Sequence, residues 1–240
     1  MTHNDAVVVD LGDRSYDILF GGLEDIGEAV SRICTKGRCF VVTNPVVRPL
    51  YAEVVERSLR SSGWEPVVLE IPDGEVNKGL ATWSGLVSEL LDNRVDRSTP
   101  VLALGGGVTG DIVGFAAASA LRGVPLIQVP TTLLSMVDSS VGGKTGLNTE
   151  HGKNLVGAFY QPSLVYIDVQ TLNTLEPEEF RAGLGEVVKH ALLADEVFFG
   201  WLERNTEKVS VLDQESLRYL VRRCCEIKGA VVSQDERESG

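Results

Sequence analysis

The 240-residue sequence predicts an α/β domain with a mostly parallel, Rossmann-like sheet, followed by an all-helical domain. Short apolar runs alternate with amphipathic stretches through residues 1–174, which is the pattern of parallel strands joined by crossover helices. A glycine-rich turn directly follows one of these runs. From Pro177 onward, apolar residues recur only at helical spacing. These observations predict a nucleotide-binding domain over residues 1–174 and the start of a helical domain over residues 175–240.

Each expected strand is an apolar run bounded by turn or polar residues. Residues 6–21 (AVVVDLGDRSYDILFG) are typical of a hairpin that turns at Gly12 and Asp13. Buried strands are predicted at 38–44, 66–72, 100–107, 124–130 and 164–169. Connecting helices are predicted at 49–62, 79–92 and 108–121. A last helix is predicted at 213–232, with one apolar stripe formed by Leu217, Leu220, Val221, Cys224 and Cys225.

The charge balance limits the partners. With 22 Lys and Arg against 34 Asp and Glu, the formal net charge is −12, so the surface repels nucleic-acid phosphates. No apolar run has the length of a membrane span, and the first ten residues carry acids where a signal peptide is basic. We therefore expect a cytoplasmic protein without membrane contact. The four cysteines form no CxxC pair and are expected to be reduced thiols.

A G-x-G-x-x-G motif, formed by Gly105, Gly107 and Gly110, lies at a strand-to-helix turn. Glycine lets the backbone approach a pyrophosphate there, and the helix N-terminus favours the negative charge. The following strand, however, ends without the acid that holds a ribose in the standard dinucleotide fingerprint. Two interpretations stay open: a nucleotide-binding turn, and a turn that is tight for packing alone.

Residues 128–148 (QVPTTLLSMVDSSVGGKTGLN) combine glycines, hydroxyls and a single lysine, Lys144, which predicts an irregular segment rather than ordinary helix or strand. A P-loop needs glycine five residues before its GKT, but this sequence has Asp138 there, and a carboxylate would repel the phosphate. A P-loop is therefore rejected. The residue types of the loop at 71–78 (IPDGEVNK), taken alone, favour a solvated turn.

Two glycines, Gly183 and Gly185, fall inside a predicted helix, where each costs about 1 kcal/mol; this suggests that a neighbour needs the room. One face of that helix carries three polar residues: Glu186, Lys189 and His190. They form either a surface ion pair or a face for a metal or substrate. Lys228 continues the apolar stripe of the last helix and either extends outward or serves a buried anion.

Together these motifs closely resemble the 3-dehydroquinate synthase family. The similarity extends over most of residues 70–235, and it is carried in order by PDGEVNK, GGGVTGD, VPTTLLSMVDSSVGGKTGLN, GKNLVGAFYQP, TLNTLEPEEFRAGLGEVVKH and IKGAVV. The resemblance implies a site between the two domains, where NAD and a divalent zinc or cobalt ion serve a seven-carbon sugar-acid phosphate. It implies transient oxidation of the substrate, elimination of phosphate and ring closure to 3-dehydroquinate, a step of aromatic amino acid biosynthesis by the shikimate pathway.

The resemblance also assigns residues, motif by motif. It implies an NAD site formed by Asn44, Asp73, Gly74, Glu75, Val76, Asn77, Lys78, Gly107, Val108, Thr109, Gly110, Asp111, Thr131, Thr132, Lys144, Lys153, Thr171, Leu172, Asn173, Thr174 and Glu179. It implies that Glu186 is a metal ligand. It implies substrate contacts from Lys144 and Asn154 to the phosphate, Lys228 to the carboxylate, Lys189 to the ring hydroxyls, Asp138 beside the reacting hydroxyls, and Arg122 from the partner in a homodimer.

Two further metal-ligating histidines of the family lie in a region that would begin where this sequence stops, at Gly240. His151 and His190 do not match those positions. We therefore expect a truncated helical domain and an inactive chain. Three alternatives stay open: a related sugar-phosphate cyclase, a metal-dependent polyol dehydrogenase, and a nucleotide-binding module without activity. Catalytic use of NAD without net NADH would exclude the dehydrogenase, and the product would distinguish the cyclases.

Overall fold

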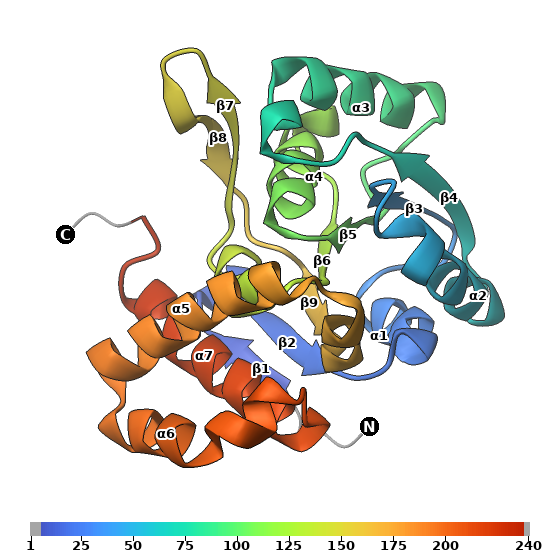
Figure 1. The fold of residues 1–240 in the computed structure, drawn as a ribbon. Helices are drawn as coiled ribbons and strands as arrows, with labels where there is room; N and C mark the ends of the chain where they lie inside the picture. The colour runs from blue at the N-terminus through green and yellow to red at the C-terminus, as the bar shows by residue number, and fades with distance from the viewer. Residues whose placement is uncertain (1–5, 238–240) are drawn as a thin grey trace.

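The computed structural model describes residues 6–237, and a seven-stranded sheet runs through its centre (Figure 1). The strand order is β1-β2-β9-β6-β5-β3-β4. All neighbouring strands are parallel except β1 and β2, which form the expected antiparallel hairpin. The strands are β1 (Ala6–Val9), β2 (Tyr16–Phe20), β3 (Arg38–Thr43), β4 (Glu65–Glu70), β5 (Val101–Gly105), β6 (Leu126–Pro130) and β9 (Leu164–Ile167). The prediction of a mostly parallel α/β fold is confirmed.

Side chains that alternate along the strands divide the core between the two faces of the sheet. On β5, Leu102 and Leu104 pack on the face covered by α1 (Ile26–Ile33) and α2 (Glu53–Ser61). Val101 and Ala103 pack on the opposite face, under α3 (Leu80–Asp92) and α4 (Gly107–Ser119). Because both faces are covered, these strands appear in the sequence as continuous apolar runs rather than as alternating ones.

The helices after residue 174 pack directly on the sheet. They are α5 (Pro177–Ala194), α6 (Glu196–Ser210) and α7 (Gln214–Gln234), and they share one apolar core with β1, β2 and β9 (Figure 1). The predicted stripe of α7 is fully buried in this core. The division of the chain into domains at residue 174 stays a prediction. Within residues 6–237, no helix is both long and apolar enough to span a membrane.

A separate two-stranded hairpin was not predicted from the sequence. Its strands, β7 (Lys144–Thr149) and β8 (Gly152–Phe159), pair antiparallel and project from the body of the molecule beside α4 (Figure 1). The expectation of irregular structure is therefore wrong for the end of the 128–148 segment. The chain enters β7 through Gly142 and Gly143, whose φ angles of 97° and 68° lie in the left-handed region that favours glycine.

Candidate active site

The predicted cofactor residues lie at the carboxyl edge of the sheet, where the chain changes direction. From β3 the chain continues outward to β4, and from β5 it continues the other way to β6, so the crevice between β3 and β5 is a topological switch point. Asn44 follows β3 and is buried; its Nδ2 donates to Thr109 Oγ1 across this crevice, at 3.3 Å. Its Oδ1 accepts from the backbone N–H groups of Val46 and Val47, at 3.0 and 2.9 Å.

The glycine-rich turn leads from β5 directly into α4, whose first residue is Gly107. A Cβ at Gly107 would lie 2.9 Å from Ser139 Oγ, and one at Gly105 would lie 2.7 Å from Thr109 Oγ1. Packing therefore favours glycine at position 105 whether or not a nucleotide binds, whereas at position 107 the contact is only with the end of a serine side chain. The turn nevertheless places the N-terminus of a 13-residue helix at the switch point, which is the geometry that binds a pyrophosphate. Thr131 and Thr132 follow β6 beside this turn.

A buried ion pair joins the 71–78 loop to α4. Lys78 Nζ contacts Asp111 Oδ2, and the two side chains are only 5% and 16% exposed. Burial raises the pKa of the Asp111 carboxyl to about 6, although the Lys78 ammonium opposes the shift. The interpretation of this loop as a solvated turn is wrong for Lys78, because the backbone between Gly74 and Lys78 folds into a short 3₁₀ turn that directs the lysine inward.

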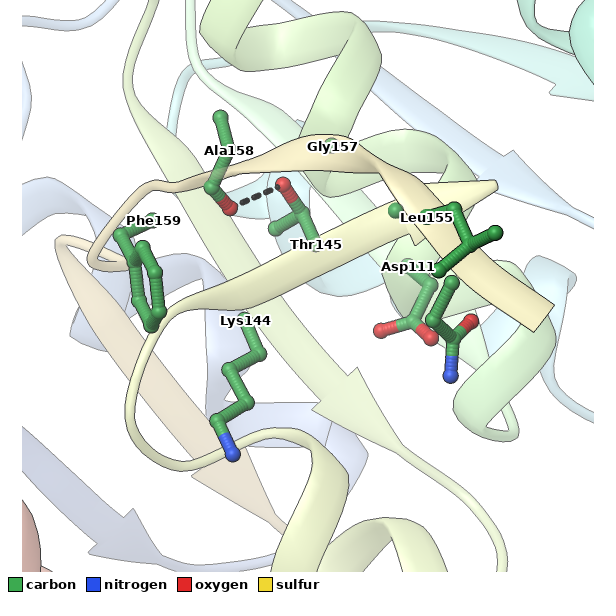
Figure 2. Close-up of a pocket in the computed structure, with 9 residues that line it drawn as sticks. Asp111, Lys144, Thr145, Leu155, Gly157, Ala158 and Phe159 are labelled. Atoms are coloured by element: carbon green, nitrogen blue, oxygen red, sulfur yellow. Dashed lines mark hydrogen bonds between the residues drawn. The ribbon is translucent and has the colours of Figure 1, made fainter. Parts of the chain in front are cut away.

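An open cavity of about 290 Å³ lies along the β7–β8 hairpin (Figure 2). Three of the predicted site residues line it, namely Asp111, Lys144 and Asn154. Lys144 begins β7, and its side chain extends from the start of that strand, whereas Asp111 lies near Leu155 (Figure 2). The rest of the lining is mainly hairpin backbone and apolar side chains, including Leu155 and Phe159. The cavity therefore offers one cation, one amide and one carboxyl group to a ligand.

A second cluster gathers metal-binding groups where α5 meets the turn at 135–139. Asp138, Glu186 and His190 each offer one ligand atom, and all three atoms lie within 4.8 Å of one another. His190 Nε2 lies 3.3 Å from Glu186 Oε1, and the imidazole is buried. Burial lowers the pKa of His190, which favours the neutral form that binds metals. Carboxylate and imidazole donors in this number suit a divalent zinc or cobalt ion.

Two lysines are paired with the carboxylates of this cluster. Lys189 Nζ lies 2.9 Å from Glu186 Oε1, and Lys228 Nζ lies 2.7 Å from Asp138 Oδ1. Lys228 thus serves an anion rather than extending outward, because α7 packs against the turn that carries Asp138. A metal ion or an anionic substrate would have to share these groups with the lysines.

Several predicted residues neither line the hairpin cavity nor belong to the metal-binding cluster. Lys153 is exposed and lies 3.7 Å from Glu75 Oε1. Arg122 is exposed at the amino end of β6, outside the cavity lining, so it is not brought to the site of its own chain. The 171–174 turn is held by Tyr51, whose hydroxyl donates to the Thr171 carbonyl at 3.0 Å.

Asp138 was not predicted as a metal ligand, because the resemblance assigned it to the substrate, but it lies beside Glu186 and His190. His190 was predicted on one helical face with Glu186, as part of either an ion pair or a face for a metal or substrate, although it does not match the histidine positions of the family. The structure places it in the metal-binding cluster. Asp138 lies 48 positions before Glu186, and only the packing of α5 on the 135–139 turn brings the two together.

Family models match most of the chain. A model described as the 3-dehydroquinate synthase N-terminal region matches residues 68–182, and one described as the C-terminal region matches residues 183–240. A 3-dehydroquinate synthase of Pelobacter propionicus is 50% identical over 236 residues, covering 98% of this chain and 66% of the relative. The Vibrio atlanticus enzyme is 48% identical, covering 98% and 65%. The chain thus spans about two thirds of the length of these relatives.

Solved structures of similar fold include sugar-phosphate cyclases. A 2-deoxy-scyllo-inosose synthase complexed with carbaglucose-6-phosphate, NAD⁺ and Co²⁺ matches with a TM-score of 0.88 at 28% identity, over 98% of this chain and 64% of that one. A 2-epi-5-epi-valiolone synthase from Streptomyces hygroscopicus with NAD⁺ and Zn²⁺ bound matches with a TM-score of 0.88 at 31% identity, over 97% and 65%. An iron-containing alcohol dehydrogenase from Thermotoga maritima, at 18% identity and a TM-score of 0.72 over 91% and 67%, shares the fold alone.

Proposed function

The chain belongs to the 3-dehydroquinate synthase family, and from this premise we propose that the protein containing it converts 3-deoxy-arabino-heptulosonate 7-phosphate into 3-dehydroquinate and phosphate. The proposal rests on one observation. In a chain of net charge −12, two lysines, Lys189 and Lys228, contact the carboxylates of the metal-binding cluster. An acidic surface repels a substrate with both a phosphate and a carboxylate, so local lysines must supply its binding.

We assign the NAD site to the switch-point crevice. The residues there fit a dinucleotide, because the N-terminus of α4 lies at the crevice and follows a glycine-rich turn. The 73–78 loop and the 171–174 turn complete the proposed site. Bound NAD supplies a reversible hydride acceptor. The role of the chain is to hold it at the open edge of the sheet, next to the cavity lined by Asp111.

We assign the divalent metal to Glu186, with Asp138 and His190 within reach. The donor set fits zinc or cobalt, and such an ion stabilises negative charge that develops on a substrate oxygen. Lys189, which contacts Glu186, is placed to donate to substrate hydroxyls at the same point.

The remaining substrate contacts are proposed from the two clusters. Lys144 and Asn154 would hold the phosphate in the hairpin cavity, and Lys228 would hold the carboxylate beside Asp138. Arg122, exposed at the far end of α4, would reach the phosphate of the partner subunit in a homodimer. We also propose that the protein is cytoplasmic and binds neither nucleic acid nor membranes.

The decisive assay measures phosphate release from 3-deoxy-arabino-heptulosonate 7-phosphate with zinc and NAD, together with NADH absorbance and product identity. Formation of 3-dehydroquinate without net NADH supports the proposal. Net NADH would indicate the polyol dehydrogenase, and a different carbocycle would indicate another cyclase. For the 240-residue chain alone we propose NAD binding without turnover, because two histidine ligands implied by the resemblance have no counterpart in it. Turnover by this chain at the rate of a longer relative would contradict that last statement.

A further inference from the structure

Polar contacts fasten the tip of the β7–β8 hairpin to the 71–78 loop. Asn148 N donates to the carbonyl of Lys78 at 2.8 Å, and Asn148 Nδ2 donates to Glu75 Oε1 at 2.8 Å. Asn148 Oδ1 in turn accepts from the backbone N–H of Asn154 at 3.0 Å. The hairpin otherwise projects from the body of the molecule, so these bonds help fix the position of its tip.

The side chain of Lys78 completes this connection. Its Nζ donates to Asn154 Oδ1 at 2.6 Å while also contacting Asp111. Lys78 is buried, and Asp111 holds its ammonium in place from α4. Asn154 has a φ angle of 57°, so its backbone is in the left-handed conformation that asparagine tolerates better than most residues. One lysine thus links the loop, the helix and the hairpin.

The chemistry of lysine determines which way the Asn154 amide faces. An ammonium has three donors and no acceptor, so it can bond only to the carbonyl oxygen of the amide. With Oδ1 directed at Lys78, the NH₂ group is directed away from it. Asn154 is exposed and lines the hairpin cavity, so Nδ2 is available there as a donor. Without Lys78 the amide could turn and present its oxygen, which would repel an anion.

We propose that Lys78 is a positioning residue that makes Asn154 a phosphate donor, by holding Oδ1 and leaving Nδ2 for the anion. This inference rests on the proposed function, which puts the substrate phosphate in the cavity. It adds a role for Lys78 on the substrate side of the site, besides its proposed place in the NAD site.

The test is a double-mutant cycle with Lys78→Met and Asn154→Ala, each protein being saturated with NAD at its own affinity. Inorganic phosphate is the probe for the inference, and its Kd is measured by titration calorimetry. We expect Lys78→Met to weaken phosphate binding about tenfold in the chain with Asn154, and less than twofold in the Asn154→Ala chain. Lys208→Met, an exposed lysine on α6, is the matched charge control and leaves the Kd unchanged.

Equal losses in both backgrounds would overturn the inference, because Lys78 would then act on phosphate directly or through the fold. Absence of phosphate binding by the unmodified chain would overturn it as well. If Lys78→Met unfolds because Asp111 is left buried and unpaired, Lys78→Met/Asp111→Asn is compared with Asp111→Asn instead. Titration with 3-deoxy-arabino-heptulosonate 7-phosphate is run in parallel. If the chain binds phosphate with the expected coupling between Lys78 and Asn154 but does not bind the heptulosonate, the proposed function is contradicted and the inference about Lys78 is supported.

Discussion

Gly183 and Gly185 are separated by a single residue in the interior of α5. Gly183 is closely packed, whereas Gly185 has open space around it. A Cβ at Gly183 would lie 2.7 Å from Leu133 Cβ and 2.8 Å from the backbone N of Leu134. A Cβ at Gly185 would meet nothing within 4 Å, and the residue is exposed. The same substitution, glycine to alanine, should therefore change the free energy of unfolding in opposite directions at the two positions.

The magnitudes follow from two effects. In an exposed helix interior, alanine is favoured over glycine by about 1 kcal/mol, so Gly185→Ala should stabilise the protein by about that amount. Gly183→Ala gains the same propensity, but carbon atoms pack at about 3.5–4.0 Å, so the new methyl overlaps a neighbour that includes backbone. Overpacking costs about 1–3 kcal/mol. We expect Gly183→Ala to be about 2 kcal/mol less stable than Gly185→Ala.

Urea unfolding followed by circular dichroism measures both variants against the unmodified chain. A second measurement, cobalt binding, tests the local displacement, since Gly183 lies three residues before Glu186 and packs against Leu133 and Leu134, which directly precede the 135–139 turn that carries Asp138. Gly183→Ala should weaken cobalt binding, whereas Gly185→Ala should not. If the two variants had equal stability, or if Gly183→Ala were the more stable, the close packing of α5 on Leu133 and Leu134 would be refuted.

Four other predictions concern Lys144, Gly107, Asp111 and the cysteine thiols. Lys144→Ala, in an active protein containing this chain, should lower kcat/KM roughly a hundredfold without unfolding it, and a near-normal kcat/KM would remove Lys144 from the site. Gly107→Val should weaken NAD binding at least about tenfold in calorimetry because the backbone must come close to the pyrophosphate; unchanged affinity in a folded variant would leave only the packing role. Burial raises the pKa of Asp111 from 3.8 to about 6, so its stabilising contribution is complete below about pH 4 and is lost as the pH rises through 6. Relative to Asp111→Asn, the unmodified chain should lose about 3 kcal/mol of unfolding free energy over that range, and parallel pH curves would contradict the shift. Burial raises the pKa of Cys39 to about 12, and of the four thiols only Cys34 is partly exposed; a thiol reagent at pH 8 should therefore modify at most one cysteine before denaturation, and two or more fast-reacting thiols would disagree with the packing.

Local patterns in the sequence were sufficient for most of the fold. The apolar runs that become β3, β5 and β6 are buried on both faces, and burial on both faces leaves a continuous hydrophobic signal. The last helix was predicted to within two residues at each end because its stripe repeats with the helical period. The β7–β8 hairpin was missed because β8 is mostly exposed and carries no such signal.

The order of the strands and helices, the glycine turn before α4 and the family resemblance can therefore all be read from contiguous stretches of the chain. Which side chains meet depends on the three-dimensional packing. Lys78 contacts Asp111 and Asn154, which follow it by 33 and 76 positions, and Asp138 lies beside Glu186 only through the packing of α5. Periodicity reports how each segment is buried, whereas the pairing of distant charged groups depends on how crossovers place loop ends at one edge of the sheet. A lone lysine or carboxylate in a loop has no periodic signal, so its partner is decided by packing alone.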